Sequence, residues 1–218
     1  MRLIYHPLSP YSRKVYVLAI ELGLAHLITL DKVVVAPVPY PGWSDNNLYL
    51  SDAGNPLAKI PTLVVEDIEG GPLAIFDSKV ICEYLIARAG TEVVEEIKSD
   101  RVRWQEKSIH AACDGMVDAE ILCVYEERIR AEKGLLYQPW IDGQREKVTR
   151  GFDFLERMAK SGAIRTREAQ QTISLAEVSA AVALRFFDTR KVEWRQVLCK
   201  HHWQQKIGNE LQNRRYSQ

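Results

Sequence analysis

The sequence changes its pattern once along its length, and this change limits the folds open to the chain. Up to about Gly90, short apolar runs typical of strands alternate with segments of helical periodicity. Beyond that point the strand-like runs stop, and long stretches with helical periodicity follow. We therefore expect two domains, residues 1–88 and 99–218, joined by a linker from Ala89 to Ser99.

The first domain is predicted to contain its elements in the order β-α-β, then a loop, then β-β-α. The strands are RLIY, ITLDKVVV, PTLVVED and the end of GGPLAIF, and the helices are SRKVYVLAIEL and DSKVICEYLIAR. Each helix has one apolar face, made by Val15, Leu18, Ala19 and Leu22 in the first and by Val80, Ile81, Tyr84 and Leu85 in the second. The Pro-rich stretch APVPYPGWSDNN predicts an irregular loop. The fold class is thus an α/β domain followed by an all-α domain.

Charge and apolar content argue against several classes of protein. Lys and Arg together number 29, as do Asp and Glu, so the chain lacks the basic excess typical of a nucleic-acid binder. No apolar run reaches the ~18 residues that span a bilayer, and the N-terminus lacks the apolar core of a signal peptide. We therefore expect a cytoplasmic protein that binds neither nucleic acid nor membrane.

The cysteines are far apart in the sequence and form no CxxC pair or metal-ligand cluster. They are Cys82, Cys113, Cys123 and Cys199. We expect no disulfide and no metal site, and Cys82, within the apolar run VICEYL, is interpreted as a buried small hydrophobe.

The stretch SPYSRKV places two hydroxyls, Ser9 and Ser12, where a strand gives way to a helix. Ser9 followed by Pro10 fits a helix cap with proline at the first helical position. The alternative is that one of the two hydroxyls binds a sulfur atom. Taken alone, this motif favours the cap.

The stretch NPLAKIPTL contains Pro61 at the start of a predicted strand. A cis Ile60–Pro61 bond there would turn the chain sharply and leave the N–H and C=O of Ile60 free to pair with an extended peptide. The alternative is a trans proline that only begins the strand, which is the commoner case.

Asp77 and Ser78 stand at the start of the next helix. Both are preferred capping residues, so one interpretation is structural. The other uses the same geometry, because free N–H groups and the positive end of the helix dipole bind a carboxylate while Asp77 accepts from an ammonium. Together the two residues would then recognise the zwitterionic end of an amino acid.

The order of these three motifs within a β-α-β-β-β-α frame resembles the glutathione transferase superfamily, close to a bacterial-type serine or cysteine branch. In the helical half, WQEKSIHAACDGMVDAEI and SLAEVSAAVALRFFDTR look like that family's fourth and sixth helices. The resemblance implies a thioredoxin-like first domain that binds glutathione as co-substrate, and a helical domain that supplies most of the second-substrate pocket. It also implies a homodimer.

By motif position, the resemblance implies that Ser9 faces the glutathione sulfur. Lys59 and the Ile60 backbone would hold the glycyl and cysteinyl parts, and Asp77 with Ser78 the γ-glutamyl end. Ser12 is a second candidate for the sulfur, although family members with Cys-Pro-Phe or Ser-Pro-Phe place that residue before the proline, which favours Ser9. The loop from Pro37 to Gly54 matches no motif for the glycyl carboxylate.

The leading hypothesis is an enzyme that activates the glutathione thiol for attack on a small hydrophobic electrophile, by conjugation or by isomerisation or reductive dehalogenation. A hydroxyl donor and a helix N-terminus are a plausible source of a lowered thiol pKa. One alternative is a glutathione-binding or regulatory module without catalysis. A thiol-disulfide oxidoreductase would need an attacking cysteine where Ser9 stands.

Two features of the helical half are assigned mainly to folding. Ser174 and Glu177 have the spacing of a capping box. A stripe of small residues at helical spacing allows another helix or a ligand to approach, and helix packing is the favoured interpretation. The stripe consists of Ser108, Ala111, Ala112, Gly115 and Ala119.

Overall fold

The fold was analysed in a computed structural model, which describes residues 1–35, 46–90, 99–165 and 174–190. The chain forms two compact units, Met1–Glu96 and Ile97–Gln218. The first unit contains all the strands of the described residues, and the second is helical. The observed fold is therefore a small mixed α/β domain followed by a helical domain.

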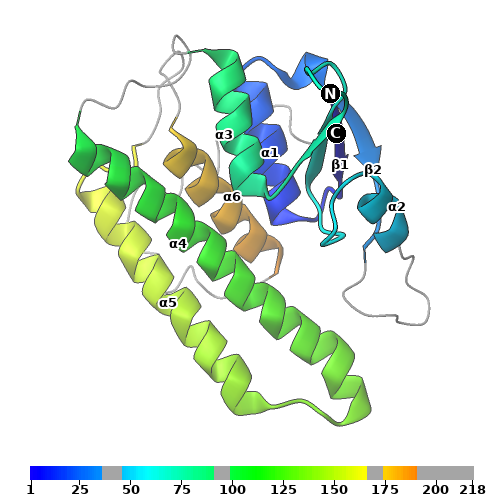
Figure 1. Ribbon diagram of the computed structural model, residues 1–218. Coiled ribbons are helices and arrows are strands. Elements are labelled where there is room, and N and C mark those ends of the chain that lie inside the picture. The colour runs from blue at the N-terminus through cyan, green and yellow to red at the C-terminus, as the bar shows by residue number, and fades with distance from the viewer. Residues whose placement is uncertain (36–45, 91–98, 166–173, 191–218) are drawn as a thin grey trace. The chain divides into compact units, whose positions relative to one another are not determined.

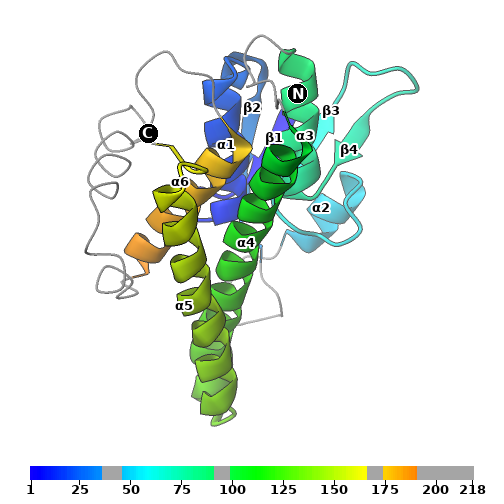
Figure 2. The ribbon, with the colours of Figure 1, turned by 90° about the vertical axis from the view of Figure 1, so that its left-hand side faces the viewer.

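The first unit is built on a sheet of four strands in the order β2-β1-β3-β4 (Figures 1 and 2). The strands are β1 (Arg2–Tyr5), β2 (Thr29–Lys32), β3 (Thr62–Val65) and β4 (Leu73–Ile75). β1 runs parallel to β2, whereas β3 is antiparallel to both β1 and β4. The four predicted strands are present: β1 has the predicted bounds, β2 and β3 are shorter than predicted, and β3 begins one residue after Pro61.

Helices α1 (Pro10–Glu21) and α3 (Ser78–Ala89) pack against each other beside the sheet (Figures 1 and 2), and a short 3-10 turn, η1 (Ala25–Leu27), leads into β2. The predicted apolar face of α1 is buried throughout. In α3 the prediction is wrong for Val80, which is 46% exposed. At 100° per residue Val80 lies on the side of the helix away from Ile81 and Leu85, and Cys82 shares their buried face instead, as expected for a small hydrophobe.

A short helix, α2 (Asn47–Asp52), begins at the last residue of the stretch APVPYPGWSDNN that was predicted as an irregular loop, of which residues 36–45 lie outside the described residues. Its Leu50 is fully buried and forms a cluster with Ile4, Val33 and Val64. Because successive strand residues point to opposite faces, Ile4 faces this cluster while the equally buried Leu3 points the other way. A helix of six residues with one buried side chain has too little periodicity to be recognised in a sequence.

The second unit consists mainly of α4 (Asp100–Tyr125), α5 (Gln138–Lys160) and α6 (Leu175–Thr189). A π-helical turn, η2 (Glu126–Arg130), and a 3-10 turn, η3 (Ala131–Lys133), connect α4 to α5. α4 packs on both α5 and α6, and the rings of Phe152 and Phe187 meet edge to face at 5.0 Å. The capping box is confirmed, since Ser174 and Glu177 each bond the other's backbone at the start of α6.

The surfaces of α4 differ in how they are packed. At the α4–α5 crossing, a Cβ added to Gly151 would lie 2.3 Å from Cγ of Met116, so the two helices approach closely there. By contrast, the small residues Ser108, Ala111 and Gly115 are exposed, and of the predicted stripe only Ala119 is buried. Within the described residues the stripe does not serve the helix packing that was predicted.

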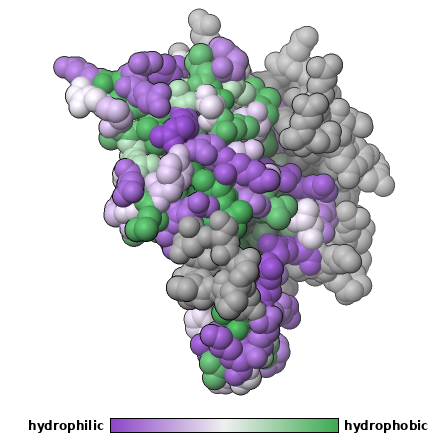
Figure 3. Space-filling model, turned by 90° about the vertical axis from the view of Figure 1, so that its right-hand side faces the viewer, coloured by the Kyte–Doolittle hydropathy of each residue, from purple (hydrophilic) through white to green (hydrophobic). Residues whose placement is uncertain are grey.

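No helix in the described ranges is both long and apolar enough to cross a bilayer. On the face shown in Figure 3, hydrophobic residues lie in patches between hydrophilic ones. Cys82, Cys113 and Cys123 are buried free thiols, and Cys199 lies outside the described residues.

Candidate functional site

The strand register brings the three sequence motifs to one end of the sheet. Ile4, near the end of β1, pairs with Thr62 at the start of β3. Leu63 of β3 pairs with Ile75, the last residue of β4. The loop that follows β1, the residues that precede β3 and the loop that follows β4 therefore meet at this end. They carry Ser9, Ile60 and Asp77 respectively.

Ser9 caps α1, and its Oγ accepts the N–H of Ser12 at 3.3 Å. The Ser9 side chain is partly exposed, and its hydroxyl donates to no residue that the structure describes. Ser12 is fully buried, and its Oγ accepts the N–H of His6 at 3.5 Å. Of the two hydroxyls, only that of Ser9 is open to a ligand.

The Ile60–Pro61 bond is cis, the less common of the two forms that the sequence left open. Neither the N–H nor the C=O of Ile60 forms a hydrogen bond within the described part of the chain. The side chain of Ile60 packs against the cluster around Leu50, and the side chain of Lys59 is exposed. A backbone donor and acceptor thus remain available at the same end of the sheet as Ser9.

Asn55 organises the turn before Ile60, a role that the sequence analysis missed. Its buried Nδ2 donates to the carbonyl of Lys59 at 2.9 Å and to Oγ1 of Thr62 at 2.8 Å. Its Oδ1 accepts the N–H of Leu57 at 3.0 Å, and Thr62 Oγ1 also donates to the Lys59 carbonyl at 2.9 Å. The signal available in the sequence was the Asn-Pro dipeptide, which marks a turn.

Asp77 is the N-cap of α3, and its Oδ1 accepts the N–H groups of Lys79 at 3.0 Å and of Val80 at 3.4 Å. Its side chain is exposed, and Oδ2 bonds to none of the described residues. Ser78 is the first residue of the helix and is buried. The capping interpretation is therefore correct, and one carboxylate oxygen remains free for a ligand.

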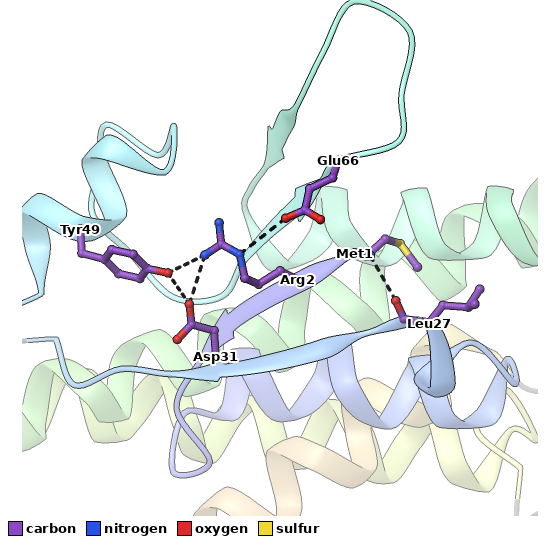
Figure 4. A network of polar contacts seen from close by, with 6 residues as sticks. All are labelled: Met1, Arg2, Leu27, Asp31, Tyr49 and Glu66. Atoms are coloured by element: carbon purple, nitrogen blue, oxygen red, sulfur yellow. Dashed lines mark hydrogen bonds and ion pairs between the residues drawn. The ribbon is translucent and has the colours of Figure 1, made fainter.

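A polar network, also missed from the sequence, holds α2 beside the sheet (Figure 4). Arg2 Nη1 lies 3.1 Å from Asp31 Oδ2, Arg2 Nε lies 3.9 Å from Glu66, and the Tyr49 hydroxyl contacts both Arg2 and Asp31. The bond to Asp31 raises the pKa of Tyr49, which therefore stays a donor. The network joins α2 to β1 and β2.

Polar side chains are also buried in the helical unit, among them His110 and Glu120. His110 is buried, with Nε2 3.1 Å from Oδ2 of Asp114. Glu120 is also buried, its Oε2 has no hydrogen-bond partner among the residues that the structure describes, and burial raises the pKa of its carboxyl. Burial likewise raises the pKa of the Cys123 thiol to about 11, so this cysteine is no nucleophile. No group of three or more metal-ligating side chains occurs in the parts of the chain that are described.

Family models match both units of the chain. A model for the glutathione S-transferase N-terminal domain matches residues 8–88, and one for the glutathione S-transferase C-terminal domain matches residues 138–206. The chain belongs to the glutathione S-transferase family. The first match contains all three motifs, which confirms the predicted superfamily and its two-domain fold.

Relatives span nearly the whole chain. The uncharacterized GST-like protein YibF of Escherichia coli (strain K12) is 31% identical over 196 residues, covering 88% of this chain and 84% of YibF. A glutathione transferase family member from Pseudomonas fluorescens Pf-5 was solved with bound glutathione. It is 33% identical, with a TM-score of 0.71 over 89% of this chain and 87% of that one. A second structure, with bound S-(propanoic acid)-glutathione, is 31% identical to this chain. Its TM-score is 0.74, and the match covers 99% of this chain and 95% of that one.

Proposed function

We propose that this protein is a glutathione transferase whose first unit binds glutathione at the shared end of β1, β3 and β4. The observation that supports the proposal most strongly is that three groups available to a ligand lie at that end. They are the hydroxyl of Ser9, the backbone N–H and C=O of Ile60, and the second carboxylate oxygen of Asp77. Glutathione bound to the Pseudomonas fluorescens relative, at 33% identity, supports the same ligand.

Ser9 faces the sulfur of glutathione in this proposal. Its Oγ already accepts a hydrogen bond from Ser12, so its own hydrogen is free to be donated to a thiolate. The N-terminus of α1 adds a favourable electrostatic contribution. A donor and a helix dipole stabilise the thiolate over the thiol and so lower the pKa of the bound sulfur.

The remainder of glutathione lies along the other two motifs. The cysteinyl part pairs with the N–H and C=O of Ile60, as an added strand pairs with a sheet edge, and Lys59 holds the glycyl part. The γ-glutamyl ammonium binds Oδ2 of Asp77. The carboxylate binds the N–H and the hydroxyl of Ser78, because the N–H groups of Lys79 and Val80 already bond to Asp77. The residues of the 37–54 loop up to position 45 lie outside the described residues.

The second substrate is a small hydrophobic electrophile. Next to Ser9, Leu8 is 71% exposed and offers an apolar surface for it. With a chlorinated aromatic, the thiolate sulfur attacks the carbon that carries chlorine, the C–S bond forms and chloride leaves with the electron pair of the C–Cl bond. The thiol proton goes to solvent, so no general base is required.

Turnover of a chlorinated aromatic with glutathione tests the proposal. Ser9→Ala is expected to lower kcat more than tenfold, at about 1.4 kcal/mol per tenfold, with glutathione affinity nearly kept. The buried Ser12 supplies the control, since Ser12→Ala leaves the sulfur-facing hydroxyl in place and its effect is mild. A large loss of kcat in Ser12→Ala with a mild one in Ser9→Ala would mean that Ser12, not Ser9, faces the glutathione sulfur.

The second candidate is a glutathione-binding or regulatory module of the same fold without catalysis. It is favoured if calorimetry detects glutathione binding while a broad panel of electrophiles gives no turnover. The presence of Ser9 and of the Asp77–Ser78 pair places it behind the enzyme. Glutathione is a cytosolic thiol buffer, so both candidates act in the cytoplasm.

We also propose a homodimer that uses the exposed stripe on α4. Ser108, Ala111 and Gly115 are exposed between two large apolar residues, Trp104 at 60% and Leu122 at 42% exposure. Small residues allow a second helix to approach closely, and flanking apolar side chains add area to bury. Sedimentation of the intact chain as a monomer at micromolar concentration would contradict this assembly.

A further inference from the structure

The loop between β1 and α1 is held by His6, which no sequence motif singled out. Nδ1 of His6 accepts the N–H of Leu8 at 3.2 Å, and its carbonyl accepts the N–H of Ser9 at 3.0 Å. Its own N–H is 3.5 Å from Oγ of Ser12. Three groups of one residue thus bond to the chain on both sides of the start of α1.

The side-chain bond has the geometry of an Asx-turn. In such a turn, the side-chain oxygen of Asn or Asp accepts the N–H two residues ahead and fixes the backbone between them. His6 does this with a ring nitrogen, which must carry no proton to act as acceptor. Burial and the positive charge of Lys32 lower the pKa of His6, which is consistent with a neutral ring.

A second tether comes from the helix side of the same loop. Nη2 of Arg13 donates to the carbonyl of Pro7 at 3.1 Å. His6, which follows β1, therefore holds the backbone N–H groups of Leu8 and Ser9. Arg13, which belongs to α1, holds the backbone carbonyl of Pro7. Between the tethers, the Leu8 side chain is directed outward and Ser9 is set as the cap of α1.

We propose that His6 is a positioning residue, whose neutral imidazole fixes the backbone of Pro7 to Ser9 so that the Ser9 hydroxyl faces the glutathione sulfur. This inference rests on the proposed function of Ser9. His6 contributes no atom to the reaction and acts only through the loop. Replacing His6 therefore changes the ionisation of the glutathione sulfur and the turnover, but not the affinity that comes from binding the two ends of glutathione.

The test compares His6→Ala with His6→Asn in the full chain. Ala removes the acceptor, whereas Asn restores one at a similar position and completes an ordinary Asx-turn. One neutral hydrogen bond is worth a rate effect of about twofold to tenfold. We expect His6→Ala to lower kcat by that factor with KM for glutathione nearly unchanged, and His6→Asn to keep kcat within about twofold. Failure of His6→Asn to keep kcat would overturn the inference.

A double variant separates this inference from the function of Ser9 itself. Because His6 acts through the Ser9 hydroxyl, His6→Ala should add almost nothing to the loss caused by Ser9→Ala. Additive losses would overturn the inference while leaving Ser9 in place. If the wild type is active and Ser9→Ala leaves its kcat unchanged, the proposed function of Ser9 is wrong instead.

Hydrogen exchange at the Leu8 amide gives a readout that needs no activity. We expect protection in the wild type and in His6→Asn, and its loss in His6→Ala. Equal protection of this amide in all three proteins would overturn the inference.

Discussion

The two units differ in what sets the path of the chain. At the site end of the sheet, Asn55, Thr62 and Ser12 are buried and each is hydrogen-bonded, so polar side chains set the path of the loops. In the helical unit Glu126 and Ser174 are likewise buried and hydrogen-bonded, but the buried Glu120 has one oxygen without a partner among the described residues. There α4 and α5 also approach closely, at Gly151 and Met116. Hydrogen bonds of buried side chains thus set the site loops of the first unit, whereas close packing sets the α4–α5 crossing of the second.

Replacing Asn55 should lower the stability of the first unit more than any other substitution considered below. Asn55→Ala deletes two donors and one acceptor, leaving the buried Thr62 hydroxyl and the Lys59 carbonyl each with one bond fewer. We expect the free energy of unfolding to fall by about 2–4 kcal/mol, measured by urea denaturation. Unchanged stability would mean that this turn is set by packing, as in the helical unit.

Asp77 allows its capping role to be separated from its proposed ligand role. Asp77→Ala should weaken glutathione binding by about 1–3 kcal/mol and also destabilise α3. Asp77→Asn keeps a good cap but removes the charge, so stability is retained while affinity still falls. Calorimetry and thermal unfolding measure the two effects, and an unchanged dissociation constant in both variants would make Asp77 a cap only.

Two glycines of α5 form a matched pair for the packing of the second unit. Gly151→Ala places a methyl group against Met116 and should cost about 1–3 kcal/mol. Gly143, in the same helix, has no atom within 4 Å of an added Cβ, so Gly143→Ala should stabilise by about 0.5–1 kcal/mol. Equal effects of the two variants on the urea midpoint would show that close approach is unimportant.

The buried carboxyl of Glu120, one oxygen of which has no partner among the described residues, predicts that the stability of the protein depends on pH. Burial raises the pKa of Glu120 in the folded state, so the folded protein holds this proton where the unfolded chain has released it. Its contribution to stability is thus greatest below the unfolded pKa of about 4.5 and declines as pH rises through the folded pKa. Glu120→Gln should remove that decline.

Unfolding of the wild type and of Glu120→Gln at a series of pH values measures the effect. We expect the variant to gain on the order of 1 kcal/mol relative to the wild type from acid to neutral pH. Parallel curves would show that Glu120 finds a partner in solution.

Features that depend on local pattern could be predicted from the sequence, and those that depend on register could not. The buried face of α1 and the start of α3 follow from residue types at short spacing, whereas the sequence left the cis and trans forms of the bond before β3 both open. The contacts of His6, Asn55 and the Arg2–Asp31–Tyr49 network require the turn and strand geometry to be known first. Val80 was misplaced because an apolar residue type does not reveal which side of α3 faces the sheet.

The central claim is that Ser9 stabilises the thiolate of glutathione bound at the shared end of β1, β3 and β4. The ultraviolet absorbance of the thiolate, followed against pH with glutathione bound, tests it most directly. We predict that the pKa of the bound thiol lies about two units below its free value of about 8.5 and returns toward that value in Ser9→Ala. A bound thiol that titrates at the free value in the wild type, or one unaffected by Ser9→Ala, would contradict the claim.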